Sequence, residues 1–195
     1  MVILALSLAL TFFIVSNPIG NSPVILALIK DFNYAKQKQI MLREAILALA
    51  LALFFQFCGE VFLGLLYVKP YTLTYCGGIL LFLVAISMIF PVPPDEVKKM
   101  KQEPFFVPIA TPLISGPGLM TVIMAKSQEI DSWWIITLAI ILAWIPVTIA
   151  LVGSPLMQQV LKRRGMVALE QLMGMILMLI SVEMVVSATM KYLNA

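Results

Sequence analysis

Two short polar interruptions break otherwise hydrophobic segments of this sequence, and their residues are the ones best suited to bind a solute. The first spans Ser16–Asn21 and contains Pro18, and the second spans Ser115–Gly118 and contains Pro117, 99 positions further along. Proline removes a backbone donor and opposes continuation of a helix, whereas glycine lets the chain turn and a ligand approach closely. Each interruption therefore predicts unpaired backbone groups inside a hydrophobic segment.

Backbone groups released in this way can bind a small dipolar molecule. Helices that resume near Gly20–Ser22 and Gly118–Met120 would present free N–H groups and the positive ends of their dipoles. The half-helices before them would turn carbonyl groups toward the same cavity, giving donors for a carboxylate and acceptors for an ammonium group. A zwitterionic amino acid matches both sets, although other small dipolar or anionic solutes also fit.

The side chains at the interruptions strengthen this interpretation. The candidate substrate-binding residues are Ser16, Asn17, Pro18, Gly20, Asn21, Ser115, Gly116 and Gly118. Ser22, Thr111 and Thr121 add hydroxyl groups nearby, and Gly20 and Gly118 are candidate hinges. In the alternative interpretation, Asn and Ser only satisfy backbone groups that the prolines release, and Gly116 and Gly118 only allow close helix packing.

Two carboxylates, Glu60 and Glu183, fall within hydrophobic segments and are candidates for carrying a coupling proton, since a carboxylate inside a membrane is costly. The alternative is that both lie near the outer interface and form local hydrogen bonds. The sequence has no histidine, which excludes Ser-His catalysis and His-based metal sites. Cys58 and Cys76 have no metal-ligand spacing, so we predict no catalytic residues, metal or cofactor.

The elements that position these residues must lie in lipid. The chain has 195 residues, of which 62% are hydrophobic and 12% charged, and its mean hydropathy is +1.03. Such a composition is typical of an integral membrane protein, and it makes nucleic-acid binding an unlikely function. The segments expected to span the bilayer are Val2–Ile29, Ala45–Val68, Leu73–Phe90, Phe105–Ala125, Trp133–Val152 and Met166–Met190.

The distribution of basic residues predicts the topology. Ten of the thirteen lysines and arginines follow the first, third and fifth segments, and the other three are Lys69, Lys126 and Lys191. The positive-inside rule then places both termini outside the cytoplasm. With three spans in each half, the second half enters from the opposite face and forms an inverted repeat. Gly78–Leu81 also resembles Gly174–Leu177 in sequence.

The expected fold is an all-α membrane domain with six transmembrane helices in a 3+3 inverted repeat, its first and fourth helices broken at mid-membrane. Residues 1–90 form the first three-helix repeat and residues 105–195 the second. Between them lies a polar, proline-rich cytoplasmic linker at 91–104, whose role the sequence leaves open.

At Asn17–Asn21 and Ile114–Gly118 the chain resembles the MarC family of bacterial and archaeal membrane proteins, over essentially its whole length. This family belongs to a wider lysine-exporter-like group and includes transporters of small neutral amino acids such as glycine and alanine, with proton coupling. The resemblance implies a similar activity in the plasma membrane.

These observations favour a secondary transporter of glycine- or alanine-like amino acids that works by alternating access, with a proton as candidate coupling ion. The alternatives are an exporter or a passive channel for other small polar solutes, and a non-transporting scaffold. An intramembrane enzyme is disfavoured because no Asp pair, histidine or Ser/Lys dyad falls at membrane depth. The substrate, the direction of transport and the oligomeric state stay open.

Overall fold

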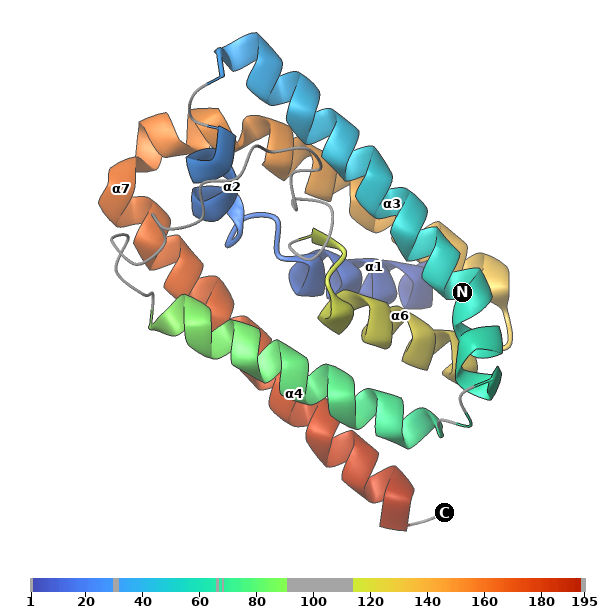
Figure 1. Ribbon diagram of the computed structural model, residues 1–195. Coiled ribbons are helices and arrows are strands. Elements are labelled where there is room, and N and C mark those ends of the chain that lie inside the picture. Colours follow the sequence, from blue (N-terminus) through green and yellow to red (C-terminus); the bar gives the residue numbers. More distant parts are fainter. Residues whose placement is uncertain (1, 30–31, 66, 68, 91–113, 194–195) are drawn as a thin grey trace.

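The protein is helical throughout the residues that the computed structural model describes, which are 2–29, 32–65, 67, 69–90 and 114–193. In chain order its helices are α1 (Val2–Ser16), α2 (Ser22–Ile29), α3 (Tyr34–Leu65), α4 (Pro70–Ile89), α6 (Pro117–Glu129) and α7 (Trp133–Leu193) (Figure 1). The predicted linker 91–104 and the first part of the predicted fourth span, including Thr111, lie outside the described residues.

Four helical stretches in the described part of the chain are long and apolar enough to cross a bilayer: Tyr34–Gly59, Tyr71–Ile89, Trp133–Lys162 and Arg164–Leu193. α7 contributes two of them because its backbone leaves helical geometry at Lys162, where φ is 52° and ψ is −176°. Large apolar side chains cover the outside, and Ile149 and Leu179 are 68% and 72% exposed. So apolar a surface requires lipid as its solvent, which makes this an all-α membrane protein.

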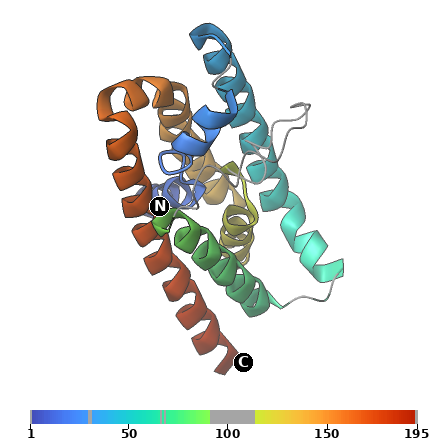
Figure 2. The ribbon, with the colours of Figure 1, turned by 60° about the vertical axis from the view of Figure 1, so that its left-hand side comes forward.

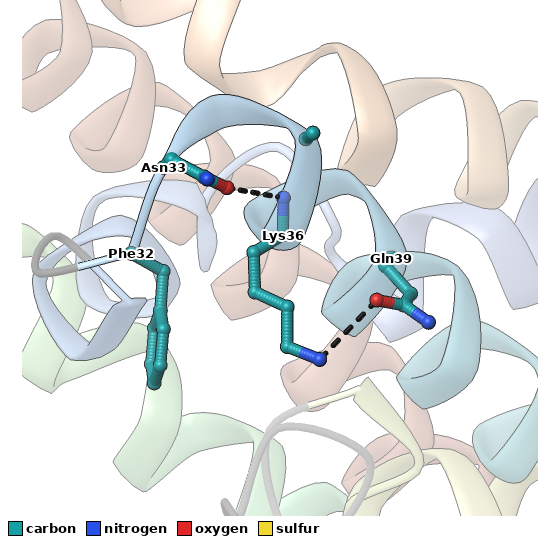
Figure 3. A pocket seen from close by; sticks show the side chains of 5 residues that line it. Phe32, Asn33, Lys36 and Gln39 are labelled. Atoms are coloured by element: carbon teal, nitrogen blue, oxygen red, sulfur yellow. Dashed lines mark hydrogen bonds between the residues drawn. The ribbon is translucent and has the colours of Figure 1, made fainter.

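Two of the predicted spans are longer than the sequence indicated. Lys36, Lys38 and Arg43, which we expected in a loop, lie on the first turns of α3. Lysine and arginine are good helix formers, and the Asn33 side chain accepts a hydrogen bond from the Lys36 N–H at 2.9 Å, which caps the helix (Figure 3). The fifth span, predicted to end at Val152, likewise continues to the bend at Lys162.

Aromatic and basic side chains collect at opposite ends of these helices. Tyr71 at the start of α4 packs edge-on against Tyr192 at the end of α7, with ring centroids 5.6 Å apart. Trp133 at the start of α7 contacts the ring of Phe57. The lysines at the start of α3 and at the bend of α7 lie at the other end. Aromatic rings at the membrane boundaries and an excess of cations at one of them are typical of membrane-spanning bundles.

The interrupted segments occupy the middle of the bundle. α3 packs along the first part of α7 and α4 along the second part, while α1 and α6 lie between these two pairs and touch each other (Figures 1 and 2). Phe12 of α1 and Ile123 of α6 are fully buried. The fold therefore buries one face of α1 and of α6 inside the protein, while Leu6 and Leu10 leave the other face of α1 exposed.

Two glycines let α4 and the second part of α7 approach closely. A Cβ placed on Gly78 would lie 3.0 Å from the carbonyl oxygen of Ser181, and one placed on Gly174 would lie 3.1 Å from that of Ala85. The two contacts are equivalent, because Gly78 and Gly174 are 96 positions apart in the sequence, and so are Ala85 and Ser181. Each helix thus offers the other a glycine at an equivalent place.

Candidate solute site at two helix interruptions

The first interruption begins where α1 ends at Ser16. Asn17 has a positive φ of 48°, a left-handed conformation that asparagine tolerates better than most residues. Its N–H still donates to the carbonyls of Phe13 and Ile14, at 3.2 and 3.1 Å. The buried Pro18 follows and cannot continue the helix. The predicted break in the first span is therefore present, and α2 resumes at Ser22.

Polar side chains of this segment satisfy much of the released backbone. The Asn17 amide oxygen accepts the Gly20 N–H at 3.2 Å, and the Asn21 amide donates to the Ser16 carbonyl at 3.4 Å. The Ser22 hydroxyl donates to the Pro18 carbonyl at 2.7 Å. These bonds match the alternative interpretation, in which the polar side chains repair the break. They also hold Ser16, Asn17 and Asn21 in fixed positions.

The first interruption is pressed against α4. The Asn17 amide donates to the sulfur of Met88 at 3.0 Å, and a Cβ on Gly20 would lie 2.4 Å from the Met88 Cε and 2.6 Å from the Asn17 side chain. Only glycine fits there without displacing a neighbour. Asn17 and Gly20 are therefore packed inside the protein, with side-chain contacts from a different span.

The second interruption is built differently. Ser115 is fully buried, and its hydroxyl donates to the Ala48 carbonyl of α3 at 2.7 Å. Gly116 has an extended backbone (φ −73°, ψ 170°), and α6 starts after it with Pro117 in its first turn and without a side-chain cap. The Met120 N–H donates to the Gly116 carbonyl at 3.1 Å. Here a helix N-terminus begins inside the bundle with its first amides uncapped by side chains.

This N-terminus also rests on α4. A Cβ on Gly118 would lie 2.7 Å from a methyl carbon of Leu81, and one on Gly77 would lie 2.2 Å from the hydroxyl oxygen of Thr121. The Thr121 hydroxyl donates to the Gly118 carbonyl at 2.8 Å. Small residues on both helices thus allow close packing, so Gly118 has a packing role whatever else it does.

One face of α4 brings the two interruptions into the same neighbourhood. Met88 contacts the first and Leu81 contacts the second. These two residues are seven positions apart, which places them on one helix face about 10 Å from each other. The structure therefore gathers Asn17, Gly20 and Gly118 along one face of α4, and their role in a shared solute site stays a prediction.

The role of the two predicted coupling carboxylates does not follow from the described structure. Glu183 is exposed on α7, and the side chain of Glu60 on α3 lies outside what is described. Their proposed role in proton coupling stays a prediction.

The sequence interpretation missed a third carboxylate, Glu44. Its side chain is 4% exposed and lies 2.7 Å from the guanidinium of Arg43, which is 61% exposed. It sits on α3 one turn before Ala48, the residue that accepts the Ser115 hydroxyl. Met41, Ala45, Ala48 and Ala52 form a helical pattern of small and apolar residues that also includes position 44. That pattern could have indicated burial.

The chain is similar to known membrane proteins along almost its whole length. The description "MarC family integral membrane protein" matches residues 2–193. The UPF0056 inner membrane protein YhgN of Escherichia coli strain K12 is 35% identical over 182 residues, which is 92% of each chain. The UPF0056 membrane protein of Buchnera aphidicola subsp. Baizongia pistaciae is 33% identical over 184 residues, again 92% of each chain.

A relative from Chlamydia trachomatis shows the same degree of similarity. The UPF0056 membrane protein of Chlamydia trachomatis serovar D is 36% identical over 184 residues, which is 93% of this chain and 90% of the relative. No solved structure matches the chain significantly. Because the match covers both interruptions and all the described helices, this chain belongs to the MarC family of integral membrane proteins.

Proposed function

We propose that this protein is a secondary transporter that moves small neutral amino acids, glycine- or alanine-like, across a bacterial plasma membrane by alternating access. The observation that carries the proposal is the position of the two interruptions, which lie in the middle of the bundle against one face of α4. Irregular backbone at membrane depth is tolerated where protein covers it or where it lines a cavity, and paired interruptions in two halves are typical of transporter substrate sites.

The two interruptions suit the two ends of an amino acid. The first turn of α6 has backbone N–H groups without a side-chain cap, which favours a carboxylate. In the first interruption, the carbonyls of Ser16 and Pro18 each accept one bond from a side chain. A carbonyl has two lone pairs, so each can also accept from an ammonium group.

Alternating access would follow from six spans arranged as a 3+3 inverted repeat. The reciprocal contacts of Gly78 and Gly174 support this arrangement, since two helices related by a two-fold axis must exchange equivalent contacts. The pattern extends to a second pair, because Gly78 also faces Met184 while Gly174 faces Met88, with the same shift of 96 positions. The halves would then rearrange around the solute.

The proposed orientation has both termini outside the cytoplasm. It is supported by the lysines at the start of α3 and the bend of α7, which lie opposite the aromatic end. A C-terminal alkaline phosphatase fusion should be active and a fluorescent-protein fusion dark in a bacterial host. The reverse pattern would rule out this orientation.

Uptake of labelled glycine and alanine into proteoliposomes tests the proposed function. The parent protein should show saturable uptake, accelerated by unlabelled glycine inside the vesicles. Gly118→Val and Asn17→Leu should each strongly reduce uptake, because the valine would displace Leu81 at the second interruption and leucine cannot make the hydrogen bonds of Asn17 at the first. Gly64→Val is the matched control, since a Cβ at Gly64 meets no atom within 4 Å.

The same assay separates the alternatives. Uptake without saturation or counterflow would indicate a passive channel. Undiminished uptake by both Gly118→Val and Asn17→Leu would remove the interruptions from the mechanism. Proton coupling predicts that an inward proton gradient stimulates uptake and that Glu44→Gln, Glu60→Gln or Glu183→Gln abolishes this stimulation. If all three variants keep it, the proton travels elsewhere.

A further inference from the structure

An open apolar groove lies between the beginning of α3 and the first part of α7, away from the helix interruptions. Its volume is about 730 Å³, and the residues that line it include Lys38, Leu42, Thr148, Ile149, Gly153 and Leu156. Its apolar walls are exposed: Leu42 is 48% and Leu156 is 51% accessible. In a bilayer these walls would contact acyl chains.

Packing behind the groove closes its floor. The Trp144 indole N–H donates to the Ala45 carbonyl at 2.7 Å, and the Ser154 hydroxyl lies 3.6 Å from the sulfur of Met41. These contacts join α3 and α7 beneath the opening. The groove therefore lies on the surface of two packed helices, and a ligand would enter it from the lipid side.

A second hollow adjoins the groove at the start of α3. It has a volume of about 420 Å³ and is lined by Phe32, Asn33, Ala35, Lys36 and Gln39 (Figure 3). Gln39 lines both hollows, and its amide oxygen accepts a hydrogen bond from the Lys36 ammonium at 3.2 Å (Figure 3). A polar hollow at the helix end thus continues into an apolar groove further along the helix.

Both hollows carry positive charge. Lys36 lines the polar hollow and Lys38 lines the groove, and the described residues that line either one include no acidic side chain. The Lys38 ammonium lies 4.5 Å from the centroid of the Tyr34 ring, a cation–π contact that keeps the charge at the mouth. The opening therefore favours an amphiphile with an anionic head.

We propose that this composite site binds an anionic phospholipid. The phosphate-bearing headgroup lies in the polar hollow, near Lys36, Lys38 and Gln39, and one acyl chain follows the groove past Leu42 and Gly153. Basic pockets between transmembrane helices bind anionic headgroups for the same electrostatic reason. Neutral lipid, detergent or a second copy of the chain can also cover an apolar groove, but their binding would not depend on the charges of Lys36 and Lys38.

Native mass spectrometry of the purified full chain tests the site. The protein is exchanged into mixed micelles that contain equal amounts of phosphatidylglycerol and phosphatidylcholine. The parent protein should retain phosphatidylglycerol several-fold more than phosphatidylcholine. Gly153→Leu should lose the bound lipid, because a Cβ at Gly153 points into open space and a larger side chain fills the groove. Gly64→Leu, at another open helical glycine, should retain it.

Charge is tested by a second matched pair. Lys38→Gln should abolish the preference for phosphatidylglycerol, while Lys69→Gln should keep it. Both lysines lie over a tyrosine ring, but Lys69 is at the opposite end of the bundle. This pair decides the question if Gly153→Leu fails to fold. Equal retention of the two lipids by the parent, retention unaffected by Lys38→Gln, or a dimer mass without lipid would each overturn the proposal.

Discussion

At the scale of single residues, the two interruptions differ in how they treat the backbone. Asn17 adopts a left-handed conformation and accepts the Gly20 N–H, so the first interruption is largely self-contained. The second relies on Ser115, which reaches across to α3, and leaves its helix start uncapped by side chains. The sequence predicted both positions because proline and glycine constrain the backbone directly. It could not predict the hydrogen bonds between spans, since Ser115 donates to Ala48 of α3 and the Asn17 amide donates to Met88 of α4.

Replacing Gly118 tests how tightly the second interruption packs. Gly118→Ala should destabilise the protein by about 1–3 kcal/mol, because its Cβ would collide with Leu81. Combining it with Leu81→Ala should cost less than the sum of the single changes, by about 0.5–3 kcal/mol. The measurement is unfolding in mixed micelles. As a control, Gly64→Ala should be neutral or stabilising by up to about 1 kcal/mol. Additive effects of Gly118→Ala and Leu81→Ala would show that the contact is absent.

At the scale of elements, hydrophobic runs located the four long spans of the described structure well but their ends poorly. The start of α3 was missed because its lysines resemble a loop in composition, whereas Asn33 caps a helix that already includes them. Glu44 directly precedes the predicted start of the second span at Ala45, and its burial was overlooked. The similarity of Gly78–Leu81 to Gly174–Leu177 was a weak sequence signal, and the helix contacts at both glycines give it a structural counterpart.

Disulfide cross-linking tests whether the contacts of α4 and α7 are reciprocal. In a chain with Cys58→Ser and Cys76→Ser, we expect Gly78→Cys to cross-link with Met184→Cys, and Gly174→Cys with Met88→Cys. A Cβ at each glycine would lie 3.3 and 3.0 Å from the partner Cβ, close to the distance that a disulfide needs. The control pair is Gly78→Cys with Val182→Cys. It should not cross-link, because Val182 is exposed. Cross-linking of only one reciprocal pair would argue against the inverted repeat.

At the scale of the whole molecule, composition and charge were sufficient to predict a multi-span membrane protein, whereas the family was indicated by the resemblance of the two interruptions. The predicted topology rests on the alternation of basic residues, which can be read without coordinates, and the orientation that it implies stays a prediction. The aromatic end formed by Tyr71, Trp133 and Tyr192 was not predicted, because it becomes visible only when distant helix ends are brought together. The groove between α3 and α7 is likewise a property of packing.

The account depends on one claim above the others, that both interruptions line a single solute site. Protection from cysteine labelling measures this directly. In the same cysteine-free background, Asn21→Cys and Gly116→Cys each place a thiol at a half-buried position of one interruption, and Gly64→Cys serves as the control. The rate of maleimide labelling is measured with glycine, with alanine and with glucose. The account predicts that glycine or alanine slows labelling at positions 21 and 116 alike, that glucose does not, and that position 64 is unaffected. Protection at only one of the two interruptions, or at neither, would contradict it.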